Sequence, residues 1–549
     1  MAAQETPVVI VGGGPVGLCA GLFLAHHGVR SMVAERLTAR PVHPRARGVV
    51  ARTMELFREL GLEAQVRRVA RRFPGNDSWV AVDTLTRANL ASGRRTGEFG
   101  GWQRYEEYSP TAAMMCPQYA LEPILLGAAR DAGVELRFGT EVTALSHDDD
   151  GVSVVFRDST GQRVSRSAEY VIGADGPRST VRTLLGSGMS GVQDFGDAIS
   201  VFFRADLGEA VSGHDFAGCW IRTPAARGTL LPADDHTSWI YLRRISPGER
   251  AADYPPDRCR ELIRIAVAAP ALDIDIVSVL RWRQQAGVAE NFSSGRVFLA
   301  GDAAHVMPIA GGFGANAGIQ DAHNLAWKLA ARLAGTGGAG LLDSYQAERK
   351  KIAEFTVRQA VLRTVHPDLR WDRAGTLRRA RLGMAEALAV QLAYRYGAGV
   401  PPAAPPAPGG RDGTARLLHG LPGTRVPHAW VGYQGQRVST LDLLGSGFVL
   451  LTGPDGERWC RAARHAAAAR GVRLAAYRVG PAGDLVDPAA EWAQRAGVGT
   501  GSALLVRPDG FVAWRGSDDM TAPGNAVAPA GAGEPASRIV HALSAALGW

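Results

Sequence analysis

The chain has 549 residues, enough for about three or four domains, so a single small binding module is excluded. Hydrophobic residues make up 46% and charged residues 21%, which is typical of a folded globular protein and excludes a mainly disordered chain. The formal net charge is +8, but the basic residues are nearly all arginines spread along the chain. Because they form no patch or arm, we expect no nucleic-acid partner.

The five cysteines are widely separated and contain no CxxC pair, which predicts neither a disulfide framework nor a metal site. This usage is typical of a reducing compartment, so we expect a cytoplasmic protein. One uncharged stretch, residues 7–25, is long enough to suggest a membrane segment, but glycines and Pro15 interrupt it and no basic cluster precedes it. We therefore predict no membrane association.

The first 36 residues predict a strand, a glycine-rich turn, a helix and a second strand that ends at Glu35. Gly12, Gly14 and Gly17 satisfy the GxGxxG pattern. Such glycines permit a tight turn, the approach of a pyrophosphate to the helix N-terminus and close packing of the helix on the strand. Glu35 would accept a hydrogen bond from a ribose hydroxyl. The unit predicts a dinucleotide site, and the alternative is a glycine-rich turn in another kind of βαβ unit.

The middle of the chain predicts antiparallel strands. Residues 134–158 alternate between apolar and polar around an aspartate-rich turn, which indicates a hairpin. Several short strands between about 198 and 283 predict an antiparallel sheet that is inserted into the nucleotide-binding unit and forms a wall for a substrate cavity. A buried strand at 296–300 then precedes a Gly-Asp pair, and an amphipathic helix is predicted over 317–333.

We predict an α/β fold with a Rossmann-like nucleotide-binding domain, an inserted antiparallel-sheet substrate domain and a C-terminal α/β domain. A helical segment and a proline-rich linker join the last domain to the rest. The predicted ranges are 1–75, 112–187 and 285–365 for the nucleotide-binding domain, 76–111 and 188–284 for the substrate domain, 366–410 for the helical segment and linker, and 411–549 for the C-terminal domain.

Three separated segments together resemble one known family. They are the GxGxxG unit, the run DGPRSTVR from Asp175, and the run GDAAHVMPIAGGFGANAGIQDAHNLAWKLA from Gly301. In combination they resemble the class A flavoprotein aromatic monooxygenases, the p-hydroxybenzoate hydroxylase-like group, over about residues 5–365. The resemblance implies noncovalent FAD, NADPH or NADH as a transient co-substrate, and O2.

The resemblance also implies roles for individual residues. Asp302 would bind the ribitol of FAD, and Arg45 would pair with the pyrophosphate through its planar fork. Asp175 and Gly176 would serve both FAD and the nicotinamide cofactor. Small residues after Pro308 would let backbone N–H groups at a helix N-terminus approach the flavin. The predicted cofactor-binding residues are Gly12, Gly14, Pro15, Val16, Gly17, Glu35, Arg36, Arg45, Gln118, Asp175, Gly176, Gly301, Asp302, Pro308, Gly312, Gly314, Ala315 and Asn316.

No residue stands out as the substrate base. Pro308 is in register with the family, but Ile309 follows it where many relatives have a second proline. The polar side chains of the predicted antiparallel sheet are candidates to face a cavity, although a lone polar residue in a strand is more often structural. The catalytic candidates are Pro308, His236, Tyr241 and Arg222.

The implied reaction is aromatic hydroxylation. NAD(P)H would reduce FAD, O2 would add to the reduced flavin, and the flavin C4a-hydroperoxide would deliver an oxygen atom to a small aromatic, polycyclic polyketide-type substrate. Two alternatives stay open. One is a Baeyer–Villiger or oxidative-rearrangement monooxygenase of the same fold, and the other is a catalytically silent flavin-binding scaffold. We expect a monomer or a homodimer.

The C-terminal part, residues 411–549, resembles the thioredoxin-like extension of some of these monooxygenases, including aromatic polyketide hydroxylases. Thiol exchange needs an accessible cysteine of low pKa and a resolving partner. Cys460 is the only cysteine in this part. We therefore expect a structural or dimerisation role there rather than redox chemistry.

Overall fold

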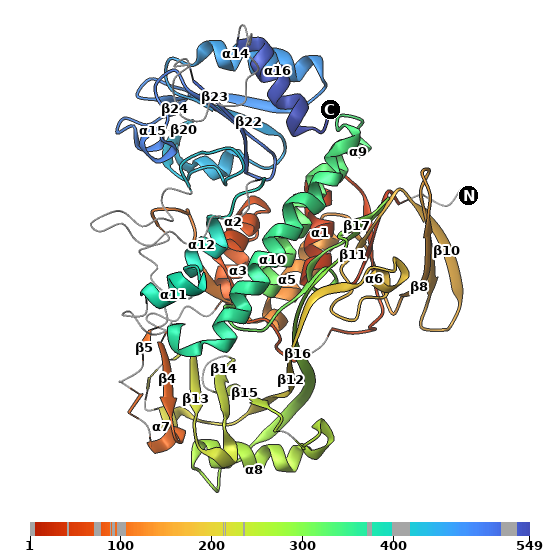
Figure 1. Ribbon diagram of the computed structural model, residues 1–549, viewed down its shortest axis with the longest axis vertical. Helices are drawn as coiled ribbons and strands as arrows, with labels where there is room; N and C mark the ends of the chain where they lie inside the picture. The colour runs from red at the N-terminus through yellow and green to blue at the C-terminus, as the bar shows by residue number, and fades with distance from the viewer. Residues whose placement is uncertain are drawn as a thin grey trace.

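The computed structural model has three large sheets at three levels of the molecule (Figure 1). The C-terminal sheet lies at the top of that view, a six-stranded sheet in the middle and an eight-stranded sheet at the bottom. The structure describes residues 6–40, 43–70, 78–87, 89–90, 94–95, 106–211, 213–214, 216–233, 237–246, 248–370, 376–397, 418–517 and 535–549. The proline-rich stretch 401–410 lies outside these residues.

The six-stranded sheet is built around β1 (Val8–Val11), whose four apolar residues are all buried. Strand β1 is parallel to β2 (Ser31–Glu35) on one side and to β11 (Tyr170–Gly173) on the other. A parallel sheet covered on both faces favours such uninterrupted apolar strands. The carboxyl ends of these strands meet at one edge, where open α/β sheets bind ligands. The remaining strands are β18 (Val297–Leu299) beside β11, β17 (Ser293–Ser294) as the outermost strand beside β18, and β7 (Glu135–Phe138) beside β2.

The helix that follows β1 packs against two other helices. Helix α1 (Pro15–His26) packs against α5 (Gln118–Asp131) and against α9 (Gly314–Leu333), which begins three residues before its predicted start. The predicted hairpin is confirmed by the antiparallel pair β8 (Glu141–His147) and β9 (Val152–Arg157). A third strand, β10 (Arg163–Ala168), completes the small sheet at the right of Figure 1.

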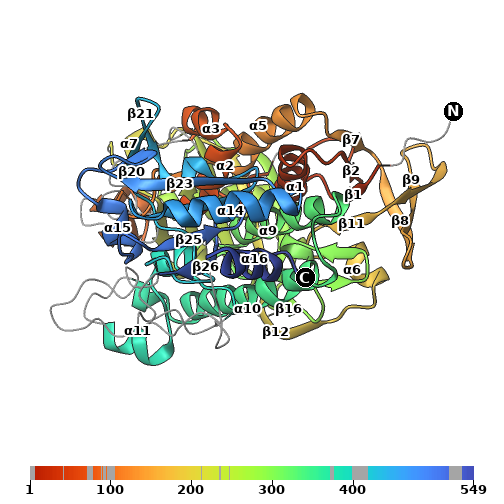
Figure 2. The same ribbon diagram turned by 90° about the horizontal axis from the view of Figure 1, so that it is seen from above.

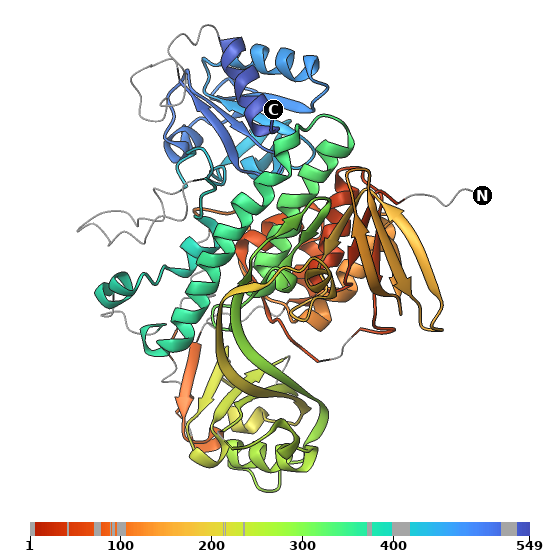
Figure 3. The same ribbon diagram turned by 45° about the vertical axis from the view of Figure 1, so that its right-hand side comes forward.

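The eight-stranded sheet is mostly antiparallel, with one parallel pair between β13 and β4. Its two longest strands, β12 (Met189–Arg204) and β16 (Asp275–Ala289), run from the middle of the molecule into the lower sheet (Figure 3). Strand β16 also pairs with β19 (His305–Val306), so the lower sheet is joined to the loop after β18. The other strands are β15 (Ser238–Arg244), β14 (Gly228–Pro232), β13 (Gly218–Ile221), β4 (Ser78–Val82) and β5 (Arg94–Arg95).

The two faces of this lower sheet have different partners. One face, which includes Val201 and Trp239, packs against α8 (Pro256–Val267) in one buried apolar cluster. The opposite face carries a separate cluster that includes Phe202 and Ile240. Successive strand residues point to opposite faces, so this division follows directly from the strand register.

The C-terminal part forms a seven-stranded sheet. Its core strand β22 (Phe448–Thr452) is parallel to β23 (Leu474–Gly480) and antiparallel to β25 (Ala503–Val506). Helices α14 (Glu457–Ala469) and α16 (Pro535–Ala546) lie side by side on it (Figure 2). The remaining strands and helix are β20 (Trp430–Tyr433), β21 (Gln436–Ser439), β24 (Leu485–Val486), β26 (Val512–Gly516) and α15 (Glu491–Ala496).

Helix α10 (Asp343–Val365) crosses from the C-terminal part toward the lower sheet, parallel to the length of the molecule (Figure 3). Among the residues that the structure describes, no helix is both long and apolar enough to cross a membrane. The remaining α-helices of the described residues are α2 (Ala51–Glu59), α3 (Glu63–Val69), α6 (Thr180–Leu184), α7 (Gly208–Val211), α11 (Thr376–Leu382) and α12 (Ala387–Leu392).

Candidate cofactor site

The GxGxxG turn lies at the carboxyl edge of the six-stranded sheet. Gly12 has a φ of +109°, and a β-carbon there would lie 2.4 Å from the carbonyl oxygen of Ala174. A β-carbon on Gly17 would lie 1.9 Å from the carbonyl oxygen of Gly12. Protein packing alone therefore requires both glycines. At Gly14 no atom lies within 4 Å of the equivalent position, so the protein leaves open space at the N-terminus of α1.

Glu35 holds this turn against the end of β2. Its carboxylate accepts hydrogen bonds from the backbone N–H groups of Gly13 (2.7 Å) and Leu37 (2.8 Å). The next side chain, Arg36, is exposed. The predicted acidic residue is thus at the sheet edge as expected, and two of its acceptor positions are already used by the protein backbone.

Asp302 and Arg45 come from distant segments, and neither side chain has a hydrogen-bond or ion-pair partner among the described residues. The Asp302 side chain is exposed, yet enough protein surrounds it for desolvation to raise its pKa, which His305 and Arg45 lower only in part. A β-carbon on Gly314 would lie 3.9 Å from Asp302 Oδ1, so the carboxylate lies beside the start of α9. The site therefore combines an unpaired carboxylate, an exposed guanidinium and two helix N-termini.

The loop from Gly301 into α9 is packed tightly against α1. Gly301 has a φ of +62°, and a β-carbon on Gly318 would lie 2.7 Å from Gly301 Cα. The Asn316 side chain accepts from Val50 N–H (3.1 Å) and donates to two carbonyl oxygens, those of Gly48 and Gly312 (3.0 and 2.8 Å). The Asn316 side chain therefore joins the loop to the segment of Gly48 and Val50, and only its backbone is available to a ligand.

A buried carboxylate that the sequence analysis did not single out organises the same loop. Asp321 on α9 is fully buried and accepts from Gly301 N–H (3.1 Å), from the His305 ring (2.7 Å) and from Arg349 Nε (2.7 Å). Burial alone would raise the pKa of Asp321, but Arg349 and His305 outweigh it and lower the pKa. The sequence carries no clear signal for this role, because Asp321 is one of several polar residues along α9.

The Asp175 carboxylate has structural hydrogen bonds within its own segment, and its predicted cofactor role stays a prediction. Its carboxylate accepts from Ser179 Oγ (2.5 Å) and from the backbone N–H groups of Thr180 (2.6 Å) and Val181 (3.1 Å). Asp175 therefore stabilises the start of α6. Gly176 has a φ of +83° and open space around it. Because these bonds occupy both carboxylate oxygens, the structure favours a structural role for Asp175.

Gln118 lies at the start of α5. It donates to Glu122 Oε1 (2.6 Å), and its own backbone N–H donates to the Ala46 carbonyl (2.8 Å). These bonds join α5 to the segment that carries Arg45. Burial raises the pKa of Glu122, which Gln118 and Arg45 lower only in part.

The catalytic candidates in the lower sheet do not gather at this site. Tyr241 is fully buried on the α8 side, where its hydroxyl donates to the Ala226 carbonyl (2.7 Å) and burial raises its pKa to about 12. Arg222 is exposed and forms an ion pair with Asp83 (3.3 Å). These contacts give no support to the predicted catalytic roles of Tyr241 and Arg222, which stay predictions. His236 lies outside the described residues.

Three further residues lie on the same loop as Asp302. Pro308 is buried, whereas Ile309, in the position of the family's second proline, is 54% exposed. The Met307 side chain is half-buried beside Gly314. Pro308 therefore lies on the loop that carries Asp302 and has no group that transfers protons, and its role at the site stays a prediction.

His43 connects the Arg45 segment to the face of the lower sheet that carries Phe202 and Ile240. Its two ring nitrogens bond Ser278 Oγ (2.7 Å) and Ser200 Oγ (2.8 Å). Burial, followed by the charge of Arg45, lowers the pKa of His43 to about 4. The imidazole is therefore neutral near pH 7 and acts as a link between the two domains. A lone histidine gave no signal for this contact in the sequence.

Comparison with known proteins assigns this arrangement to a family. The profile of the FAD binding domain family matches residues 5–360. The profile of the aromatic-ring hydroxylase C-terminal domain matches residues 419–539. The chain belongs to the FAD-dependent aromatic-ring hydroxylases. This hydroxylase therefore uses FAD, NAD(P)H and O2, and the family assignment made from the motifs is confirmed.

The similarity extends over nearly the whole chain. A putative polyketide hydroxylase of Streptomyces halstedii is 41% identical and aligns with 94% of this chain and 95% of its own. Tetracenomycin A2 monooxygenase-dioxygenase of Streptomyces glaucescens is 40% identical over 94% of each chain. The structure of aklavinone-11 hydroxylase with FAD and aklavinone has a TM-score of 0.84 and 35% identity, and all of both chains is covered.

The residues at the sheet edge fit FAD. The diphosphate needs backbone N–H groups and cations, which the N-terminus of α1 and Arg45 offer, and Gly14 leaves space for its approach. A ribityl chain needs a hydrogen-bond acceptor, and Asp302 is an acceptor without a protein partner among the described residues. A ligand in this position would satisfy groups that the protein itself leaves unsatisfied.

The two glycines of the turn should respond differently to the same substitution. Gly14→Ala places a methyl group in open space at a φ of −74°, so the apoprotein should lose no more than about 1 kcal/mol, the usual cost of alanine at a helix N-cap, while FAD affinity falls. Gly17→Ala forces the turn apart and should destabilise the apoprotein by about 1–3 kcal/mol. Denaturant unfolding and FAD titration measure both quantities. Equal effects of the two variants would contradict this assignment.

Asp302→Ala should weaken FAD binding by about 1–3 kcal/mol, because a ribityl hydroxyl then loses its acceptor. The apoprotein should be at least as stable as the wild type, since the Asp302 carboxylate has no partner among the described residues and is partly desolvated. Asp302→Asn, which keeps an acceptor oxygen, is the matched control and should retain more of the affinity. Wild-type FAD affinity in the alanine variant would show that the ribityl chain lies elsewhere.

Proposed function

We propose that this hydroxylase oxygenates a polycyclic aromatic polyketide and that FAD lies along the edge marked by Gly14, Arg45 and Asp302. The relatives named above support the substrate class, since their names include polyketide and tetracenomycin enzymes. The observation that carries the FAD position is the convergence of an open glycine, an exposed guanidinium and an unpaired carboxylate on one edge.

The substrate wall is proposed to be the face of the lower sheet opposite α8. Its cluster includes Phe202 and Ile240, with Trp79 packed against it. The Tyr119 ring of α5 lies 6.2 Å from the Phe202 ring, and the His43 ring lies 6.3 Å from it. Aromatic and apolar side chains of this kind suit a flat ring system, because they gain contact area without requiring polar groups.

When bound, FAD supplies the redox chemistry that activates oxygen. The chain's own residues have other tasks. The Gly301–α9 loop presents backbone N–H groups at a helix N-terminus, which favour negative charge. Arg45 offers a fixed cation, and the apolar face around Phe202 keeps water from the substrate. Among the residues that the structure describes, none of the predicted catalytic candidates supplies a proton-transfer group at this face.

The proposed function is tested by the flavin and the product. The purified protein should be yellow, and acid precipitation should release the colour as free FAD. With a polycyclic polyketide phenol, NAD(P)H and O2, mass spectrometry should show a product 16 mass units heavier, about the mass of one oxygen atom. Oxygen from labelled O2 should lie on an aromatic carbon. A ring-expanded lactone would instead establish insertion beside a ketone, and NAD(P)H oxidation without product would reject the substrate class.

The domain ranges and the thioredoxin-like C-terminal part remain proposals. The succession of two parallel strands, β23 and β22, followed by the antiparallel strands β25 and β26 supports the thioredoxin-like assignment. We propose that this part has no redox function. Oligomeric state and the cytoplasmic location also stay predictions.

Cys460 provides the test of that proposal. It is fully buried on α14, 3.8 Å from Thr452 Oγ1, and burial raises the pKa of its thiol. All five cysteines are free and buried. Cys460→Ser should therefore leave NAD(P)H oxidation and product formation nearly unchanged at saturating FAD. Loss of turnover with normal FAD content and folding would show that a thiol takes part in the reaction.

A further inference from the structure

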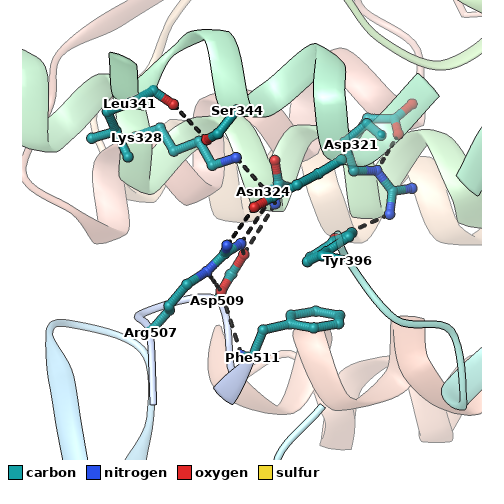
Figure 4. Close-up of polar contacts among 11 residues, drawn as sticks. Asp321, Asn324, Lys328, Leu341, Ser344, Tyr396, Arg507, Asp509 and Phe511 are labelled. Atoms are coloured by element: carbon teal, nitrogen blue, oxygen red, sulfur yellow. Dashed lines mark hydrogen bonds and ion pairs between the residues drawn. The ribbon is translucent and has the colours of Figure 1, made fainter. Parts of the chain in front are cut away.

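The polar side of α9 is buried rather than exposed. Asp321, Asn324 and Lys328 recur at helical spacing along one side of the helix, and each is at most 1% exposed. Figure 4 shows that the groups covering them come from α10 and from the β25–β26 turn, which we define as residues 507–511. The C-terminal part therefore contacts the helix that begins at the cofactor site.

The β25–β26 turn brings two charges into this contact. Arg507 donates to Glu348 of α10 (2.5 Å) and pairs with Asp509 of its own turn. Asp509 accepts from Asn324 Nδ2 (3.0 Å), and Glu348 also accepts from Lys328 (2.8 Å). A buried charge that loses its partner is strongly destabilising, so these groups hold the turn in one position (Figure 4).

From this turn a continuous series of contacts reaches the cofactor loop. The Phe511 ring lies 4.2 Å from the Tyr396 ring. The Tyr396 hydroxyl accepts from Arg349 Nη1 (3.2 Å), and Arg349 Nε donates to Asp321 Oδ1 (2.7 Å). The other oxygen of Asp321 accepts from Gly301 N–H (3.1 Å). Gly301 directly precedes Asp302 in the chain.

The members of this series have no alternative partner in solvent. Phe511 is 3% exposed and Tyr396 is 7% exposed, while Arg349 is fully buried. Arg349 also donates to the Ala317 carbonyl (3.2 Å), so its guanidinium is held on α9 from two sides. If the Tyr396 hydroxyl is removed, one guanidinium N–H group loses its acceptor in a region without water access.

We propose that the β25–β26 turn is a positioning element for FAD: through Tyr396 it orients Arg349, and through Arg349 it orients Asp321, which fixes the Gly301 backbone beside Asp302. The turn does not touch the cofactor. It sets the geometry of the loop that does. The proposal rests on the FAD position given above and not on the substrate, so a wrong substrate class leaves it standing.

Coupling of this kind must act in both directions. If the docked turn favours FAD binding, bound FAD must stabilise the docked turn by the same free energy. The amide N–H groups of residue 507 and residues 509–512 should therefore exchange with solvent more slowly when FAD is bound. A C-terminal part that only adds general stability would show no such selective change.

The experiment compares two neighbouring tyrosines in the full-length protein. Tyr396→Phe removes the hydroxyl that bonds Arg349 and keeps the ring. Tyr394→Phe is the matched control, because the buried Tyr394 hydroxyl donates to Gln320 (3.0 Å) and not to a member of the series. The Tyr394 ring does contact Phe511, Tyr396 and Arg349, and phenylalanine keeps those ring contacts. Each variant loses one buried hydrogen bond, so similar losses of apoprotein stability are expected.

We expect Tyr396→Phe to raise the FAD dissociation constant about fivefold or more, and Tyr394→Phe to change it by less than about twofold. FAD should slow amide exchange at residue 507 and residues 509–512 in the wild type and in Tyr394→Phe, but much less in Tyr396→Phe. Phe511→Leu, which removes the ring contact from the other side, should behave like Tyr396→Phe. The proposal is overturned if both tyrosine variants bind FAD alike or if FAD leaves exchange in the turn unchanged.

FAD binding at a position away from Asp302 would give a different result. If FAD bound elsewhere, Asp302→Ala would retain wild-type affinity, whatever the tyrosine variants do. If Asp302→Ala weakens FAD and Tyr396→Phe does not, the cofactor position stands and the positioning role of the turn falls. The two failures are therefore distinguishable.

Discussion

A carboxylate that has no access to water requires compensating donors, and the fully buried Asp321 on α9 obtains three of them from two other segments of the chain. It takes an N–H group from the Gly301 loop, the ring of His305, and the guanidinium of Arg349 on α10. Because no single segment satisfies it, the loop and both helices must assemble together. The geometry of the Asp302 loop follows from that requirement.

Helix α9 extends this constraint through the molecule. Its 20 residues span about 30 Å, from the cofactor loop at Gly314 to the C-terminal part. Near its far end, Trp327 belongs to the same apolar cluster as Phe448 of β22. One rigid element therefore connects the site to the C-terminal sheet. This contact gives the C-terminal part a structural role that does not depend on its only cysteine, which is buried and unpaired.

The lower sheet illustrates how strand register distributes function. Phe202 and Val201 are adjacent in sequence, but Phe202 belongs to the face opposite α8 and Val201 to the α8 side. Tyr241 follows Ile240 in the same way, and its polar group therefore ends in the core rather than near a ligand. The pattern of apolar and polar residues alone could not orient either pair, because both faces of this sheet carry apolar clusters.

The sequence by itself determined the elements whose signals are local. The GxGxxG turn, its acidic partner Glu35, the hairpin, the inserted strands and the Gly301–Asp302 loop depend on neighbouring residues, and the resemblance across three segments identified the cofactor. Only the tertiary structure decided which side of α9 is solvated. An aspartate, an asparagine and a lysine at helical spacing predict an exposed face, whereas burial beneath α10 and the β25–β26 turn depends on charges about 20 to 185 residues away in sequence.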